Sequence, residues 1–214
     1  MSTHTEHTFT TSGNRQIEIK YNTNIERGQG YFFCKPILEF ITKKYPNRVF
    51  DNCLDWCSGA GYLGYELYDN DICKQLHLMD SYGPYISKAQ DVIKKYNLPG
   101  IKTYVCDRLS LLSPKKFDLI IGNPPWTDRS PVGRLKNTNI VRTNEDYNWE
   151  THKEFFYNVK RYMTNNASIV LCEGNKFSTP KTFEPNIENA GLYIDEVYKP
   201  VDFPNIYLLE IKNK

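Results

Sequence analysis

Hydrophobic and polar positions along the chain follow two alternating patterns. Short apolar runs typical of buried strands alternate with stretches in which apolar residues recur every three or four positions, as on one face of a helix. The expected strands cover residues 52–57, 72–79, 101–106, 117–122, 167–172, 193–198 and 206–211, and the expected helices cover residues 31–45, 62–69, 86–96, 149–163 and 183–190. This alternation predicts an α/β fold with a mostly parallel sheet covered on both faces. The short connection between the last two strands predicts one antiparallel strand.

The length of 214 residues suits one α/β domain with a sizeable buried core. We place this single domain at residues 21–214. Residues 1–20 are polar and rich in Thr and His, and we expect them to form a flexible N-terminal lead-in that ends in a short ordered piece at residues 16–20. Residues 127–148 are also polar and lack a periodic pattern. We expect a mobile substrate loop there, because such long loops are usually functional or disordered.

Composition narrows the possible partners only slightly. A formal net charge of +2 neither demonstrates nor excludes a nucleic-acid partner. No stretch approaches the ~18 apolar residues of a membrane span, and residues 1–16 lack the apolar core of a signal peptide. We therefore expect a cytoplasmic protein that does not contact membranes. The 6 cysteines and 4 histidines are scattered without metal-ligand spacing, so we expect reduced cysteines and no metal site.

A glycine-rich turn follows the first predicted strand. Gly59, Gly61 and Gly64 fit G-x-G-x-x-G, which allows positive φ angles and close approach of the backbone to a ligand. The pattern alone fits a dinucleotide or S-adenosylmethionine. Asp55 favours S-adenosylmethionine, because a carboxylate there suits the ammonium group of a methionine and repels a pyrophosphate. The residues expected to contact the cofactor in this turn are Asp55, Gly59, Ala60 and Gly61.

Acidic residues end the next two predicted strands, where ligands bind in sheets of this kind. Asp80 ends the second strand, its carboxylate suits the hydroxyl groups of a ribose, and Ser81 beside it is also expected to contact the cofactor. Alternatively, Asp80 or Ser81 caps the following helix, and both roles are compatible. Asp107 ends the third strand, where it is placed to accept a hydrogen bond from the adenine amino group. An ordinary surface loop explains Asp107 equally well.

The most specific motif is N-P-P-W at residues 123–126, directly after an apolar strand. Consecutive prolines lack N–H donors and hold a rigid, extended turn, so the Asn123 side chain and the Pro124 carbonyl are expected to form a fixed pair of acceptors. Two acceptors that hold both N–H bonds of an amino group direct its lone pair toward a methyl donor. Stacking of a planar substrate on Trp126 contributes ~1–3 kcal/mol for a base. The alternative is a plain Pro-Pro turn with a core tryptophan.

These expected contacts give each residue of the N-P-P-W motif a role. Asn123, Pro124 and Trp126 are the expected catalytic residues, and Asn123 also contacts the cofactor. Pro125 and Trp126 are expected to contact the substrate.

With these residues the chain resembles the class I, Rossmann-like S-adenosylmethionine-dependent methyltransferases of the amino-nitrogen type, over roughly residues 30–214. The glycine motif of that class matches residues 55–61, its ribose acid matches Asp80, its adenine-contacting acid matches Asp107, and its N-P-P-aromatic motif matches residues 123–126. The resemblance implies three layers around a seven-stranded sheet of order 3-2-1-4-5-7-6, with the seventh strand antiparallel. It also implies methyl transfer from S-adenosylmethionine to a planar exocyclic or amide nitrogen.

Several substrates are compatible with this motif, because adenine-N6, guanine-N2 and glutamine-N5 methyltransferases share it. Residues 127–148 carry Arg129 and Arg134 soon after the motif, and a basic loop there is placed to hold phosphates. An ordinary solvated loop is the equal alternative, since Glu145 and Asp146 offset part of its charge. We favour N6 of adenine in DNA or RNA, with protein glutamine and RNA guanine-N2 as alternatives.

Two alternative functions, each from a different class of protein, are less favoured. A non-catalytic cofactor-binding subunit has no need of the acceptor pair in the N-P-P-W motif. A nicotinamide oxidoreductase gives that motif no role, although it accounts for the glycine-rich turn.

Overall fold

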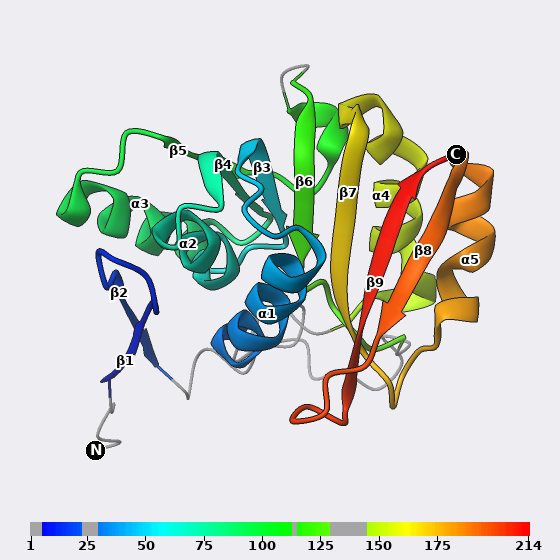
Figure 1. Cartoon of the computed structure of the whole chain (residues 1–214), viewed down its shortest axis with the longest axis horizontal. Coiled ribbons are helices and arrows are strands. Elements are labelled where there is room, and N and C mark those ends of the chain that lie inside the picture. Colours follow the sequence, from blue (N-terminus) through cyan, green and yellow to red (C-terminus); the bar gives the residue numbers. More distant parts are fainter. Residues whose placement is uncertain (1–5, 23–29, 113–114, 129–144) are drawn as a thin grey trace, which may run out of the picture.

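The structure is a computed structural model that describes residues 6–22, 30–112, 115–128 and 145–214. Within these residues, seven strands form one sheet (Figure 1). They are β3 (Phe50–Trp56), β4 (Cys73–Asp80), β5 (Ile101–Val105), β6 (Phe117–Gly122), β7 (Met163–Gly174), β8 (Leu192–Tyr198) and β9 (Ile206–Asn213). Their spatial order is β5-β4-β3-β6-β7-β9-β8, and β9 is antiparallel to both of its neighbours. Counted along the chain, this order is 3-2-1-4-5-7-6, which confirms the predicted topology.

Helices cover the two faces of the sheet (Figure 1). One face carries α1 (Cys34–Lys44), α2 (Tyr62–Asp69) and α3 (Gly83–Tyr96), and the other carries α4 (Glu150–Val159) and α5 (Pro180–Asn189). Short 3-10 turns are η1 (Gly30–Phe33), η2 (Leu109–Leu111), η4 (Tyr147–Trp149) and η5 (Lys160–Tyr162). None of the helices in the described ranges is long and apolar enough to cross a membrane.

The central strands are buried on both sides, which explains their continuous apolar sequence. Successive residues of a strand point to opposite faces. In β3, Cys53 joins the apolar cluster beneath α1 to α3, whereas Leu54 joins the cluster beneath α4 and α5. Residues 119–121 of β6 alternate between the two clusters in the same way. The sheet therefore separates two cores that both contribute to its stability.

The register of the parallel strands brings their carboxyl ends to one edge. Trp56 lies beside Met79 of β4 and beside Gly122 of β6, and Gly122 lies beside Leu171 of β7. Residues that follow these strands therefore share a small space, although they are far apart in the sequence.

The N-terminal segment differs from the flexible lead-in that residues 1–20 were expected to form. Residues 1–5 lie outside the described ranges, but β1 (Glu6–Thr10) and β2 (Glu18–Asn22) form an antiparallel hairpin. Ile17 and Ile19 are buried, and the loop between the strands is bound by Asp69 of α2. The Asp69 carboxylate accepts hydrogen bonds from the Thr11 hydroxyl and from the backbone N–H groups of Arg15 and Gln16. Contacts across more than fifty residues thus order a segment whose local sequence is polar.

We expect the Asp69→Ala substitution to lower the free energy of unfolding by roughly 3 kcal/mol, because three donors lose a buried acceptor. Urea titration followed by circular dichroism measures this change. Asp71→Asn is the control, since the Asp71 side chain is 65% exposed, its partners Arg15 and Asn14 lie at the surface, and asparagine tolerates the φ angle of 56° at this position. The control should lose less than about 1 kcal/mol. Equal losses in both variants would show that Asp69 does not anchor the hairpin.

Candidate functional site

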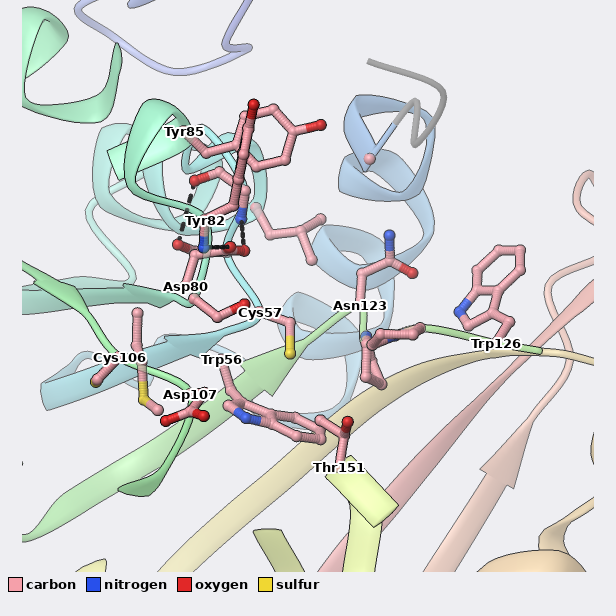
Figure 2. A pocket seen from close by; sticks show the side chains of 18 of the residues that line it. Trp56, Cys57, Asp80, Tyr82, Tyr85, Cys106, Asp107, Asn123, Trp126 and Thr151 are labelled. Carbon is pink, nitrogen blue, oxygen red and sulfur yellow. Dashed lines mark hydrogen bonds between the residues drawn. The ribbon is translucent and has the colours of Figure 1, made fainter. Parts of the chain in front are cut away.

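A cavity of about 1270 Å³ opens at the carboxyl edge of the sheet (Figure 2). Pockets for single ligands usually measure ~300–1,000 Å³, so this cavity has room for a cofactor and a substrate group together. Most of the predicted site residues line it, namely Gly59, Ala60, Asp80, Ser81, Asp107, Asn123, Pro124, Pro125 and Trp126. Asp55 and Gly61 do not line it. Arg129 and Arg134 lie outside the described residues, as do all residues from 129 to 144 of the expected substrate loop.

The two glycines of the turn have different roles. Gly59 and Gly61 both have positive φ angles, of 55° and 91°. A Cβ atom on Gly61 would lie 2.7 Å from Cε2 of Tyr65, so the absence of a side chain lets the turn pack on α2. A Cβ atom on Gly59 would meet nothing within 4 Å, because it would enter open space. Gly59 therefore leaves the backbone accessible to a ligand, whereas Gly61 is required for packing.

Asp80 joins the glycine-rich turn to the start of α3. One carboxylate oxygen accepts a hydrogen bond from Gly59 N and the other accepts one from Tyr82 N, both at 2.8 Å (Figure 2). Helix α3 has Tyr82 as its N-cap residue and no side-chain cap, so neither Asp80 nor Ser81 caps it directly. Burial raises the pKa of Asp80, and the hydrogen bonds from Tyr82, Gly59 and Ser81 partly offset that rise. A carboxylate has about four lone-pair sites, so Asp80 retains capacity for ligand hydroxyl groups.

The end of the cavity beside Asp80 is formed by the segment after β5, and its floor is formed by the end of β3. The Asp107 side chain is 64% exposed, and its carboxylate lies 4.0 Å from Nε of Arg108. Trp56 and Cys57 lie between this end and Asn123 (Figure 2). Trp56 is held in place by stacking on Phe155, with ring centroids 3.9 Å apart. The exposed Asp107 carboxylate, paired only loosely with Arg108, lines this end of the cavity.

Asn123 projects into the middle of the cavity (Figure 2). Its Oδ1 atom is buried and has no hydrogen-bond partner among the described residues. Such an acceptor costs ~1–3 kcal/mol unless a ligand satisfies it. Gly30 lies close by, because a Cβ atom on it would be 3.8 Å from Nδ2 of Asn123. The site therefore presents an acceptor aimed at a donor that the described residues do not supply.

Trp126 is fixed at the substrate end by three contacts. Its indole Nε1 donates a hydrogen bond to the carbonyl oxygen of Cys172 at 2.9 Å. Its ring lies over Gly174, where a Cβ atom would come within 2.7 Å of Cε3. Phe33 packs against it with ring centroids 4.9 Å apart. Because of these contacts Trp126 forms a rigid wall.

Several residues of the cavity wall were not among the predicted site residues. Phe32 and Phe177 line the cavity although their side chains are 47% and 46% exposed. Phe32 belongs to the segment Gly30–Phe33, whose glycine and aromatic residues before the first helix were a usable signal. Phe177 follows β7 and carries no local signal. Glu150 and Thr151 reach the cavity only because α4 packs against the sheet.

Asp55 is fully buried behind the glycine-rich turn rather than in the cavity wall. Its Oδ2 atom accepts a hydrogen bond from Gly64 N at 2.9 Å, and its Oδ1 atom has no partner among the described residues. Burial, with a contribution from the charge of Asp80, raises the pKa of Asp55 to about 8 despite the hydrogen bond from Gly64. In this structure Asp55 therefore fastens the start of α2.

No group of three or more His, Cys, Asp or Glu side chains in the described part of the chain is arranged to hold a metal ion.

Comparisons with known proteins give one family. Residues 37–148 match the family described as the methyltransferase small domain. The ribosomal protein uL3 glutamine methyltransferase of Francisella tularensis subsp. tularensis (strain SCHU S4 / Schu 4) is 24% identical over 151 residues, which cover 65% of this chain and 48% of that protein. The chain thus spans about half the length of this relative.

Solved structures of similar fold include three methyltransferases or cofactor complexes. The ribosomal protein L11 methylase from Lactobacillus delbrueckii subsp. bulgaricus has a TM-score of 0.62 and 12% identity, covering 85% of this chain and 79% of that chain. An S-adenosylmethionine-dependent methyltransferase from Clostridium acetobutylicum ATCC 824 has a TM-score of 0.61 and 15% identity, covering 89% of this chain and 95% of that chain. M. jannaschii TYW2 in complex with AdoMet has a TM-score of 0.59 and 16% identity, covering 99% of this chain and 86% of that chain. Identities this low show a shared fold.

The raised pKa of Asp55 predicts a pH-dependent stability. A carboxyl group whose pKa is raised by folding contributes stability that is fully present below its unfolded value of 3.8 and is lost as the pH rises to about 8. We expect this group to lower the free energy of unfolding by about 1.4 kcal/mol per pH unit within that range. Asp55→Asn should flatten the profile, because the amide does not titrate. Urea titrations at several pH values compare the two proteins, and parallel profiles would contradict the assignment.

Proposed function

The chain belongs to the methyltransferase small domain family, within the class I, Rossmann-like S-adenosylmethionine-dependent methyltransferases, and we propose that it methylates a planar amino nitrogen held by Asn123. One observation carries this proposal. Oδ1 of Asn123 is a buried acceptor without a partner among the described residues, and it belongs to the wall of a cavity large enough for two ligands. A non-catalytic subunit gains nothing from such an atom, which lowers stability unless a donor binds.

The residues around the cavity fit S-adenosylmethionine. When bound, this cofactor supplies an electrophilic methyl group on a sulfonium. Asp80 would accept hydrogen bonds from the ribose hydroxyl groups, while it continues to hold Gly59 and Tyr82. The open space beside Gly59 would hold the methionine end, and Asp107 would accept a hydrogen bond from the adenine amino group. Asp55 acts on the methionine end only through the turn that it fastens.

The chemistry follows from the poor reactivity of planar amino groups, whose lone pair is delocalised. The Asn123 side chain and the Pro124 carbonyl accept the two N–H bonds and turn the lone pair toward the methyl donor. Transfer requires the reacting atoms to be aligned ~3–3.5 Å apart, which a rigid Pro-Pro turn favours. Because the nitrogen loses its proton after transfer, no strong base beside Asn123 is required.

We propose N6 of adenine in DNA or RNA as the acceptor. Phe32, Phe33, Trp126 and Phe177 surround the substrate end, and the half-exposed faces of Phe32 and Phe177 suit a flat base. Stacking contributes ~1–3 kcal/mol for each base. A target in a duplex must first be flipped out, whereas a single-stranded target avoids that cost. Arg129 and Arg134 would then hold phosphates next to the site.

A glutamine side chain of a protein is the second candidate. The similarity to the ribosomal protein uL3 glutamine methyltransferase favours it. Three acidic residues on the cavity wall, Glu145, Glu150 and Glu154, also suit a basic polypeptide better than a phosphate backbone.

Methyl transfer to a panel of acceptors tests the function. We expect labelled methyl from S-adenosylmethionine to enter one of four fractions, which are single-stranded DNA, duplex DNA, RNA and ribosomal protein. Asn123→Ala should lower kcat by roughly 10- to 100-fold, because one buried acceptor contributes ~1–3 kcal/mol. Asn123→Asp is the matched control, since it keeps an acceptor at the same place. Full activity of Asn123→Ala would exclude the proposed role of this residue, and label in protein alone would replace adenine by glutamine.

Cofactor binding tests Asp80 separately. We expect Asp80→Asn to weaken S-adenosylmethionine binding by roughly 10- to 100-fold, because hydrogen bonds to a charged acceptor contribute ~1.5–3 kcal/mol. Isothermal titration calorimetry measures the change in Kd, and thermal unfolding without cofactor measures the lost support of the turn. An unchanged Kd would limit Asp80 to its contacts with Gly59 and Tyr82.

A further inference from the structure

A buried polar cluster lies beside the N-P-P-W motif but outside the cavity. It consists of Asp146, His152 and Glu173, and we call it the polar clamp. Their exposed fractions are 2%, 0% and 0%. Nδ1 of His152 lies 2.5 Å from Oδ2 of Asp146, and Nε2 of His152 lies 3.0 Å from Oε1 of Glu173. The three side chains come from the residue before η4, the first turn of α4 and the end of β7.

The surroundings of the clamp are aromatic. Phe183 stacks on the His152 ring with centroids 4.5 Å apart, while Trp56 and Trp149 meet its edges at 5.6 and 5.4 Å. Charged groups in such surroundings are costly, and apolar residues of the same volume often give equal or greater stability. The clamp therefore calls for an explanation other than stability alone.

On one side, the polar clamp adjoins the residues of β7 that hold Trp126. Glu173 stands between Cys172, whose carbonyl accepts the Trp126 indole hydrogen bond, and Gly174, which carries the Trp126 ring. A shift of Glu173 along β7 would move both contacts, because they are its direct neighbours in the strand. The position of Trp126 is thus tied to the position of Glu173.

On the other side, the clamp fixes the residue that follows the motif. Asp146 N donates a hydrogen bond to the Thr127 carbonyl at 2.9 Å. The Asp146 carboxylate accepts hydrogen bonds from Thr151 N at 2.8 Å and from His152 N at 3.2 Å, so it also holds the first turn of α4. Asn148 and Trp149 between them have left-handed φ angles of 52° and 56°. Such conformations cost of order 1–3 kcal/mol each and persist where their surroundings enforce them.

We propose that the polar clamp is a positioning device for methyl transfer, which fixes Trp126, Thr127 and the first turn of α4 around the acceptor group. This inference rests on the proposed function of the cavity. None of the three clamp residues lines the cavity, so they act through the residues that they hold.

The charge state of the clamp provides a readout. Burial alone lowers the pKa of His152, but the facing carboxylates of Glu173 and Asp146 outweigh it and raise that pKa to about 9. Of the neighbouring groups, Cys57 after β3 and Tyr207 on β9 have pKa values raised by burial, so they stay neutral at this pH. The pKa of Asp146 is lowered by His152, which outweighs burial, and the pKa of Glu173 is raised by burial. The clamp is therefore complete at neutral pH and loses its cation as the pH rises through about 9.

The test compares the variants Glu173→Gln and His152→Gln with the wild type. We expect kcat of the wild type to fall as the pH rises through about 9. Glu173→Gln should move this fall to lower pH, because loss of the carboxylate lowers the pKa of His152. His152→Gln should lower kcat by about 10²-fold, as for a ~1 Å misplacement, with little change in the Kd of S-adenosylmethionine.

A second measurement does not depend on catalysis. In nuclear magnetic resonance, the indole N–H signal of Trp126, identified by its loss in Trp126→Phe, should exchange faster with solvent in both clamp variants. Glu210→Gln is the matched control, because Glu210 is also buried but pairs with Lys44 and Lys212 beside Val170. It should lower the melting temperature without shifting the pH profile or the Trp126 exchange rate.

The outcomes separate the two proposals. An unshifted pH profile in Glu173→Gln together with unchanged Trp126 exchange would overturn the positioning role, also where His152→Gln does not fold. A wild-type protein that transfers no methyl group would overturn the proposed function, and the Trp126 exchange rates would still support or reject the clamp.

Discussion

Parallel pairing of β4, β3, β6 and β7 is the constraint on which the site depends. Hydrogen-bond register places the ends of these strands at one edge, so short segments after each strand meet across one cavity. The strand register alone brings together the glycine-rich turn, Asp80 and the N-P-P-W motif. A slip of one residue between two of these strands would turn every following side chain to the other face and separate the groups.

Three of the buried polar atoms without a hydrogen-bond partner in the described part of the chain lie at the same edge. Oδ1 of Asp55, Oδ1 of Asn123 and Oε2 of Glu173 are all buried without a hydrogen bond among the described residues. Each lowers the stability of the free protein by ~1–3 kcal/mol. The two apolar cores on the faces of the sheet compensate for this loss. The apolar cores on the faces of the sheet therefore stabilise the fold, whereas the polar groups at its carboxyl edge serve the chemistry.

The order of elements and the main site residues could be predicted because their signals are local. The helix over 62–69 and the strand over 117–122 have the bounds expected from apolar spacing. The turn glycines, Asp80 and Asn123 follow strands in the expected places and line or support the cavity. What failed depends on long-range packing. The hairpin is ordered by Asp69, which its own polar sequence does not reveal.

The same limit applies within the site. Asp55 lies behind the cavity wall, because packing of α2 decides whether a carboxylate at a strand end faces the cavity or the helix. His152 is one of 4 scattered histidines, and its partners lie 6 and 21 residues away. Phe177 reaches the cavity from a turn that has no distinguishing sequence. Spacing patterns describe one element at a time, and these residues act between elements.

The place of β9 between β7 and β8 also bears on how the chain folds during synthesis. Both neighbours of β9 precede it in the sequence, so β7 leaves the ribosome with one unpaired edge and β8, whose only partner among the described strands is β9, with two. Until residues 206–213 emerge, these edges are open to pairing with other chains, which makes the nascent protein prone to aggregation. Insertion of the last strand then closes the sheet in one late step. Slow translation of the preceding segment would prolong the period in which these strand edges are unpaired. Chaperones that shield strand edges would reduce the aggregation that results.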